Sequence, residues 1–394
     1  MNKNTLASIE YSAAHASFWM CLCVYVSFAA VYLQALGYTN AQLGIVIAAG
    51  NVLSFLVGVA ISSLIDRYPE FRAGDAVNIM LAVQMVTLAV LWFCSARSML
   101  TSVTYVLLLG FAMSVSSMLI KQWSDLLSSG LEVSFGTARA IGSGGYVILA
   151  AFIGKAVELW SVKALLVTAL ALTFVQIVLN YLLNRKTTAV SGSVEPGVKG
   201  TPLPVFMREN KPFMLFLAGL VLVFIAHNTS GSYFINIVRN LGGGTAESGY
   251  VNSLIALVEV PVMLLYHRIC RGRTPAAVVG AALVLFPLKQ FAYALAPTIP
   301  LLYASTVFQV AFAIYTPAIV DYVASVIPAK DLAKGQTLAY SMTTVGAVFA
   351  SLIGGKLYDT ISVRATLLTA ACVCVAGAAV CVSALKMKNK ADGR

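Results

Sequence analysis

The stretch GKAVELWSVKA at residues 154–164 returns as GKLYDTISVRA at residues 355–365. At this offset of 201 residues, five positions are identical, and two more exchange Glu for Asp and Lys for Arg. Two equal halves in a chain of 394 residues would repeat at close to this distance. Chance similarity between two helix ends is the alternative, and the offset argues against it. The sequence therefore predicts an internal duplication.

The composition places the chain in a membrane. Hydrophobic residues make up 59% of the chain and charged residues 10%, with a mean hydropathy of +0.87. Soluble domains carry about 25% charged residues, so this chain has too few charges to cover its surface in water. A soluble enzyme and a nucleic-acid-binding domain are excluded, although the net charge of +11 alone would suit a nucleic-acid partner.

The apolar residues fall into long runs. A helix needs about 20 mostly apolar residues to cross the hydrocarbon core of a bilayer. We therefore predict an all-α integral membrane protein with twelve transmembrane helices. They lie near residues 12–35, 41–65, 74–95, 99–126, 137–158, 162–184, 211–238, 246–268, 275–296, 300–327, 335–357 and 364–385.

A polar segment divides these twelve runs into two sets of six. It is rich in Gly, Ser, Pro and charge, which is typical of a flexible linker. We predict an N-terminal six-helix bundle over residues 1–184, a cytoplasmic linker over 185–210 and a C-terminal six-helix bundle over 211–394. Parallel six-helix repeats are the mark of a class of transporters whose halves rock around a central site.

The basic residues predict the orientation of the chain. With the N-terminus in the cytoplasm, seventeen of the 26 Lys and Arg residues fall in inside segments. Only four fall in outside loops, which are Arg97, Lys163, Arg239 and Arg364. This asymmetry follows the positive-inside rule and predicts a multi-pass protein of the cytoplasmic membrane with both termini in the cytoplasm.

Several local motifs resemble the major facilitator superfamily over nearly the whole chain. FGTARAIGSGGY at residues 135–146 is similar to the start of the fifth helix in the lactose permease-like branch of oligosaccharide–proton symporters. SSLIDRY at residues 62–68 resembles the Asp-Arg loop signature of the superfamily, which makes Asp66 and Arg67 candidates for a conformational gate. LVEVP at residues 257–261 is nearer to bacterial sugar efflux transporters.

The resemblance implies a sugar site on the fifth helix. It carries the role of a sugar ligand to Arg139, whose guanidinium offers a fixed fork of donors. It makes Tyr146, two turns further on, the aromatic residue that packs on the sugar ring. The sugar-binding acid of the fourth helix falls on Lys121, which would also suit an anionic substrate. The eighth-helix acid falls on Ala256, and Glu259, one turn away, occupies a neighbouring ligand position and is a substrate-binding candidate.

The proton route implied by the resemblance is altered here. The tenth-helix residues associated with proton coupling fall near Thr306 and Gln309. A charge pair between the seventh and eleventh helices becomes Asn228 and Thr343, which are both neutral. Galactoside specificity and the usual proton route are therefore not implied for this chain.

A few ionisable residues lie inside the predicted helices, where a charge costs at least ~2.5–3.5 kcal/mol unless it meets a cavity or a partner. Glu259 and Lys289 are the best candidates for a proton-coupling pair, followed by Asp321 and by Asp125, which lies one turn from Lys121. A static salt bridge is the alternative. His227 and Asn228 lie in an unusually polar part of the seventh helix, so we place them among the substrate-binding candidates.

These features predict a secondary transporter for a small polar solute, a sugar or glycoside, in symport with protons. Proton-antiport efflux of sugars or drugs, and uptake of nucleosides or small aromatic carboxylates, are the alternatives. An enzyme is not expected, because the sequence has no catalytic triad or metal-ligand motif. We expect no metal or organic cofactor, an ion gradient as the energy source, a monomer in the lipid bilayer, a small-molecule substrate and no nucleic-acid partner.

Overall fold

The computed structural model describes residues 3–68, 70–187 and 201–391. The chain forms two compact units: Met1–Ser193 with Gly243–Ala256, here the first unit, and Val194–Gly242 with Leu257–Arg394, here the second unit. Residues 243–256 thus belong to the first unit, although the sequence places them in the second half. The long helix α11 (Thr245–Cys270) begins in the first unit and ends in the second.

The first unit is built from helices, and three of its long helices begin where a side chain caps the free backbone N–H groups. Thr39 accepts from the backbone of Gln42, and Ser98 and Ser134 cap the helices that begin at Met99 and Phe135 in the same way. The helices are α1 (Lys3–Leu22), α2 (Ala29–Ala35), α3 (Asn40–Arg67), α4 (Ala73–Phe93), α5 (Met99–Ser128), α6 (Phe135–Leu159) and α7 (Lys163–Asn184).

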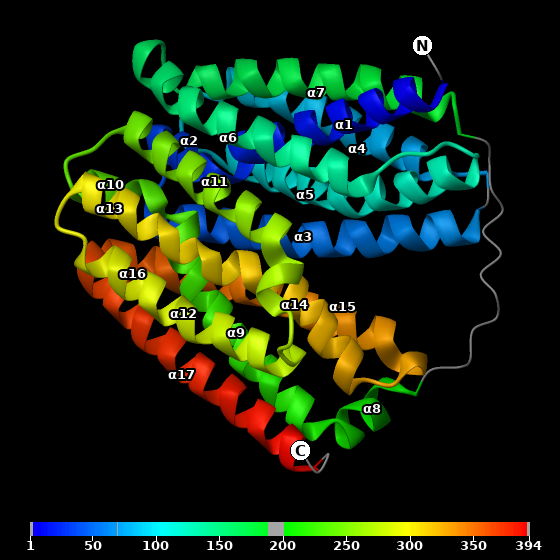
Figure 1. The fold of residues 1–394 in the computed structure, drawn as a ribbon. Coiled ribbons are helices and arrows are strands. Elements are labelled where there is room, and N and C mark those ends of the chain that lie inside the picture. The colour runs from blue at the N-terminus through cyan, green and yellow to red at the C-terminus, as the bar shows by residue number, and fades with distance from the viewer. Residues whose placement is uncertain (1–2, 69, 188–200, 392–394) are drawn as a thin grey trace. The chain divides into compact units, whose positions relative to one another are not determined.

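The second unit contains the remaining helices (Figure 1). α17 packs along both α9 and α12, and aromatic residues such as Phe216, Phe224 and Phe286 fill the core between the helices. The helices are α8 (Leu203–Glu209), α9 (Lys211–Ser232), α10 (Phe234–Asn240), α12 (Pro275–Leu295), α13 (Ile299–Ser305), α14 (Val310–Val326), α15 (Leu332–Phe349), α16 (Gly355–Thr360) and α17 (Val363–Ala391).

Eleven helical stretches in the described chain are long and apolar enough to cross a membrane, and a bent pair makes up to twelve. Their outward faces carry large apolar side chains, such as Phe152 at 70% exposure and Leu264 at 73%. Such faces are stable against lipid tails and not against water. The predicted all-α, multi-span fold is confirmed.

The first predicted span is broken. A π-helical turn, Cys23–Ser27, follows α1, and the helix bends by 46° before α2. The hydroxyl of Tyr105 donates to the backbone carbonyl of Tyr25 at 2.9 Å, so this turn has a partner outside its own helix. Apolar composition does not distinguish such a turn from a regular helix, so the sequence does not predict the break.

The predicted linker contains structure at its second end. α8 lies inside residues 185–210, and Thr201 before it is bound to the start of α15. The carboxylate of Asp331 accepts from the Thr201 backbone N–H at 2.9 Å and from its hydroxyl at 2.7 Å. Lys334 pairs with Asp331 at 2.6 Å. Residues 188–200 of the predicted linker lie outside the described residues.

Candidate functional site

In the first unit, the guanidinium of Arg139 lies over an aromatic ring. Its guanidinium carbon is 3.8 Å from the centroid of the Trp19 ring, and its Nη1 donates to the hydroxyl of Ser143 at 2.6 Å. Both contacts hold the fork of donors in one orientation, with cation–π attraction added to the hydrogen bond. Arg139 is partly buried, as a ligand-binding side chain in a membrane protein is expected to be.

Small residues on α6 allow this arrangement. A Cβ atom on Gly142 would lie 2.6 Å from Cδ1 of Trp19, and one on Gly145 would lie 3.2 Å from the sulfur of Met20. Only glycine at position 142 therefore lets Trp19 approach α6. Gly142 and Gly145 thus allow α6 to pack closely against α1.

Tyr146 lies two turns beyond Arg139 on α6. Its hydroxyl is 2.6 Å from the hydroxyl of Ser27, the last residue of the π-helical turn. π-helical turns occur often at functional sites. The side chain of Tyr146 is partly exposed, so its ring is only partly covered by the protein.

In the second unit, four side chains form a chain of hydrogen bonds. The ammonium of Lys289 donates to Oε1 of Gln309 at 2.8 Å and lies 3.2 Å from Nδ1 of His227. Nε2 of Gln309 donates in turn to Oε1 of Glu259 at 2.7 Å. We name these residues, His227, Lys289, Gln309 and Glu259, the Lys289 chain.

The donor Lys289 and the acceptor Glu259 fix the orientation of the Gln309 amide between them. A lysine ammonium can only donate and an ionised carboxylate can only accept, so the amide of Gln309 has its oxygen toward Lys289 and its nitrogen toward Glu259. His227 must accept from the ammonium at Nδ1, which leaves the ring proton on Nε2. Lys289 is 3% exposed and Gln309 is 4% exposed.

Aromatic rings surround the His227 end of this chain. The imidazole stacks on Phe312 at 5.0 Å between centroids and meets the edges of Phe224 and Phe286. The ring of Tyr293 lies 5.3 Å from the ammonium of Lys289. The charged group is thus enclosed by apolar faces, a setting in which electrostatic interactions are strong.

The other candidates of the second unit lie elsewhere. Asp321 is exposed on α14, where its carboxylate accepts from the hydroxyl of Tyr266 at 2.6 Å. Asp321 lies twelve residues beyond Gln309 in the sequence. At 1.5 Å per residue this is about 18 Å along the chain of helices. Asn228 donates to the carbonyl of Phe224 in its own helix at 2.8 Å. These bonds of Asp321 and Asn228 are made outside the Lys289 chain.

Asp125 and Lys121 lie on α5 in the first unit, partly exposed. The carboxylate of Asp125 accepts from the backbone of Ala73 at the start of α4 and interacts electrostatically with Lys121 and Arg72. Arg67, at the end of α3, lies over the ring of Tyr68 at 5.6 Å. Asp66 precedes it in the same helix, and its side chain lies outside the described part of the chain.

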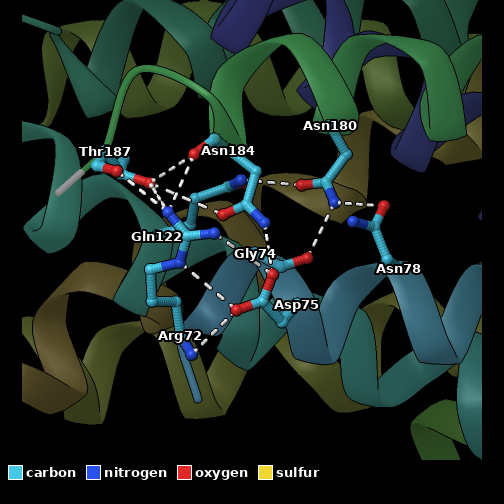
Figure 2. A network of polar contacts seen from close by, with 8 residues as sticks. All are labelled: Arg72, Gly74, Asp75, Asn78, Gln122, Asn180, Asn184 and Thr187. Atoms are coloured by element: carbon cyan, nitrogen blue, oxygen red, sulfur yellow. Dashed lines mark hydrogen bonds and ion pairs between the residues drawn. The ribbon is translucent and has the colours of Figure 1, made fainter. Parts of the chain in front are cut away.

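Figure 2 shows a polar network of the first unit. Two of its members, Arg72 and Asp75, interact electrostatically with Asp125. The carboxylate of Asp75 accepts from the Nε of Arg72 at 3.2 Å, from the backbone N–H of Arg72 at 3.1 Å and from Asn184 at 2.5 Å. Arg72 also donates to the carbonyls of Asn184 and Thr187, at 3.0 and 2.9 Å. We name this group the Asp75 network.

Asn180 extends the Asp75 network. Its amide donates to the carbonyl of Gly74 at 2.9 Å and to Asn78 at 2.8 Å, and its oxygen accepts from Gln122 at 2.6 Å. A Cβ atom on Gly74 would overlap the side-chain oxygen of Asn184, which its bond to Asp75 holds in place. The hydrogen-bonding groups of Asn180 are thus taken up by α4 and α5.

Sequence reasoning missed Gln309 and Trp19 as site residues. Gln309 had a signal, since it falls near the proton-coupling positions of the family, but as a neutral residue it does not stand out among the charges. The contact of Trp19 with Arg139 joins residues 120 positions apart, so the sequence does not predict it.

Comparison with known proteins identifies the family. The sequence pattern of the MFS_1 like family matches residues 9–369. The chain belongs to the major facilitator superfamily. It is 25% identical over 359 residues, which are 87% of this chain and 89% of the relative, to a Deinococcus radiodurans protein described as "Putative sugar efflux transporter".

Solved structures show the same fold. The nucleoside transporter NupG, in a point-mutant form, superposes with a TM-score of 0.83 at 15% identity, covering 96% of this chain and 99% of that one. The POT family transporter PepTSo superposes with a TM-score of 0.78 at 10% identity, with 99% of each chain covered. The family match and the membrane-length helices together make the protein a multi-pass membrane transporter and not an enzyme.

Proposed function

We propose that this transporter moves a sugar or glycoside across the cytoplasmic membrane in symport with protons. The observation that supports it most is the arrangement around Arg139. A fixed fork of donors lies on Trp19, with Tyr146 two turns along the same helix. Vicinal hydroxyl groups suit a fork of donors, and the apolar face of a sugar ring suits an aromatic ring.

The Lys289 chain is the proposed coupling element. Glu259 is the one carboxylate in it, and its protonation would add an O–H donor and weaken the charge-assisted bond that orients Gln309. The amide of Gln309 would then be free to turn, and Lys289 would lose a fixed partner. A protonation step is in this way linked to the packing of α9, α11, α12 and the 3₁₀ turn Thr306–Gln309 before α14. The proposal includes a proton gradient as the energy source, no cofactor, a monomer, and both termini in the cytoplasm.

Sugar efflux by proton antiport is the second candidate. The description of the Deinococcus radiodurans relative favours it, and so does the Glu259-Val260-Pro261 segment, which resembles sugar efflux transporters. Both modes use the same site and the same carboxylate. They differ in the direction of solute movement relative to protons.

Transport into proteoliposomes tests the proposal. We expect sugars or glycosides, and not nucleosides or small aromatic acids, to accumulate when the outside is acidic. Accumulation only with the opposite gradient would establish antiport. Uptake that ignores the pH gradient would overturn proton coupling, and selective uptake of a nucleoside or acid would overturn the sugar assignment.

Arg139→Lys tests the binding site directly. Lysine keeps the charge and loses the fork, so sugar affinity should fall about 100-fold, or ~2.7 kcal/mol. Arg185→Lys is the matched control, because Arg185 also lies over an aromatic ring of the first unit, Tyr181, at 5.9 Å. Unchanged affinity in Arg139→Lys would remove this residue from the site.

A further inference from the structure

A pocket of about 300 Å³ lies at one end of the second unit. The end of α10, the end of α12 and the start of α17 form it, and its lining includes Asn240, Leu241, Tyr293, Arg364 and Leu367. The loops at this end carry few basic residues, so the sequence predicts that the pocket faces the outside of the cell.

Tyr293 connects this pocket to the Lys289 chain. It lines the pocket, yet it is only 2% exposed. The ammonium of Lys289 lies 5.3 Å from its ring, and the carboxylate of Glu259 is close enough to interact with it electrostatically. One side chain therefore reaches from the wall of the pocket to the buried charges.

The polar atoms on this face of α12 are unsatisfied. Within the described residues, the hydroxyl of Tyr293 and both amide atoms of Gln290 have no hydrogen-bond partner. Gln290 is 0% exposed and lies one turn from Tyr293. Buried polar groups without a partner are rare and costly, and ordered water is what usually satisfies them.

We propose that the pocket admits water past Tyr293 to Glu259, which gives the second unit a proton route of its own. The proposal rests on the proton coupling of the proposed function. A hydroxyl both donates and accepts, so Tyr293 can receive a proton from water on the pocket side and release its own toward Glu259. One O–H bond forms at each acceptor as one breaks at each donor, and no electrons are transferred.

The charged and titratable groups around Glu259 are consistent with this role. Lys289 and Tyr293 face it from α12, and His227 on α9 and Cys374 on α17 lie around the ammonium of Lys289. Arg364 is exposed at the pocket itself, where its positive charge lowers the local concentration of protons and metal cations. The geometry thus predicts opposite effects for changes at Tyr293 and Arg364.

The test follows the protonation of Glu259 after a drop in external pH. The purified transporter is reconstituted in liposomes, and the carboxyl band is recorded by time-resolved infrared spectroscopy and assigned by its loss in Glu259→Gln. Tyr293→Phe keeps the ring and removes the hydroxyl, so protonation should slow about tenfold. Leu241→Trp, which fills the pocket, should slow it as well, and Arg364→Gln should accelerate it.

Tyr358→Phe is the matched control. Tyr358 is also a buried tyrosine of the second unit whose hydroxyl has no partner in the described chain, but it does not line the pocket. In this variant Glu259 should be protonated at the wild-type rate. The sugar affinity of Tyr293→Phe should stay within about twofold of the wild-type value.

The outcomes distinguish the proton route past Tyr293 from the coupling role of Glu259. A normal rate in both Tyr293→Phe and Leu241→Trp overturns the route and leaves proton coupling intact. If the infrared carboxyl band of Glu259 in the wild-type protein does not change with external pH, both the coupling role of Glu259 and the proton route are overturned. Slowing in Tyr358→Phe equal to that in Tyr293→Phe also overturns the route, because the effect would then not depend on the pocket.

Discussion

The Asp75 network and the Lys289 chain are both polar groups on membrane helices, but they satisfy their charges differently. Asp75 accepts four hydrogen bonds from Arg72 and Asn184, and Arg72 donates to two further carbonyls, so each charge has several partners. Lys289 and Glu259 are linked through a single neutral amide, with unsatisfied polar atoms nearby in the described chain.

The difference indicates which network is structural and which can switch. A charge with many partners loses little when one bond breaks and holds its helices in one arrangement. Two charges linked through one rotatable amide respond to each other, because protonation of one changes how the amide meets the other. We therefore assign helix packing to the Asp75 network and coupling to the Lys289 chain.

The largest expected effect is at Lys289. Lys289→Met removes the charge that orients Gln309, so gradient-driven accumulation should fall about 100-fold, or ~2.7 kcal/mol. Because this variant leaves the Glu259 carboxylate without its buried counter-charge, the melting temperature should fall as well. Lys330→Met, at an exposed lysine of the same unit, is the control. A large loss of stability with normal transport would reverse the assignment.

Gln309→Leu should have the next largest effect on transport. It keeps the size of the side chain and removes both bonds to Lys289 and Glu259. We expect gradient-driven accumulation to fall about tenfold, or ~1.4 kcal/mol, while exchange of solute without a gradient persists. The measurement is accumulation and exchange on the same vesicles. An equal loss of both would show that Gln309 supports binding and not coupling.

Asp75→Asn should act on stability and not on coupling. Breaking a fully buried pair costs ~3–5 kcal/mol. Arg72 and Asp75 are 27% and 32% exposed, so we expect about 2 kcal/mol, measured as a drop in melting temperature of about 5 °C. Transport per folded molecule should change less than about threefold. Normal stability with uncoupled transport would place a switch in the first unit instead.

The smallest effect is expected for Arg72→Lys. Lysine can keep the pair with Asp75 but cannot also reach the carbonyls of Asn184 and Thr187 as the guanidinium does. The loss should be about 1 kcal/mol, or a melting temperature lower by about 3 °C. A drop as large as that of Asp75→Asn would show that the carbonyl contacts, and not the ion pair, carry the stability of this network.

The sequence predicts the membrane fold well because apolar runs of the right length have one physical solution in a bilayer. The prediction of helix boundaries fails where contacts with other helices change the local backbone conformation. The π-helical turn before Phe28 meets the hydroxyl of Tyr105, which lies in another helix. The helix α8 lies in a segment whose composition is that of a linker, and Asp331 fixes the chain just before it.

For the site, the sequence selects the charges and misses the neutral partners. Glu259, Lys289 and His227 are candidates by sequence because ionisable groups are rare in membrane helices, and the structure brings these three together. Gln309 joins them through an amide that no composition rule distinguishes from a packing residue. Resemblance selects Arg139, and only the structure adds Trp19. The roles of all these residues stay predictions.

Helix α11 has a consequence for how the protein is made. Its first turns belong to the first unit, where Thr245 donates to the carbonyl of Gly154 at 3.0 Å and Glu158 accepts from the backbone of Ala246 at 2.9 Å. Gly154 must be a glycine there, because a Cβ atom would overlap the backbone carbonyl oxygen of Thr245.

The ribosome reaches Gly243 about 50 residues after Ser193. At a synthesis rate of ~5–20 residues per second, the surface of α6 around Gly154 stays uncovered for about 3–10 s before residues 243–256 begin to be made. During that time the nascent first unit is incomplete in the membrane. We expect a chain that stops in the linker to leave this surface of α6 uncovered and the first unit less stable than in the full chain.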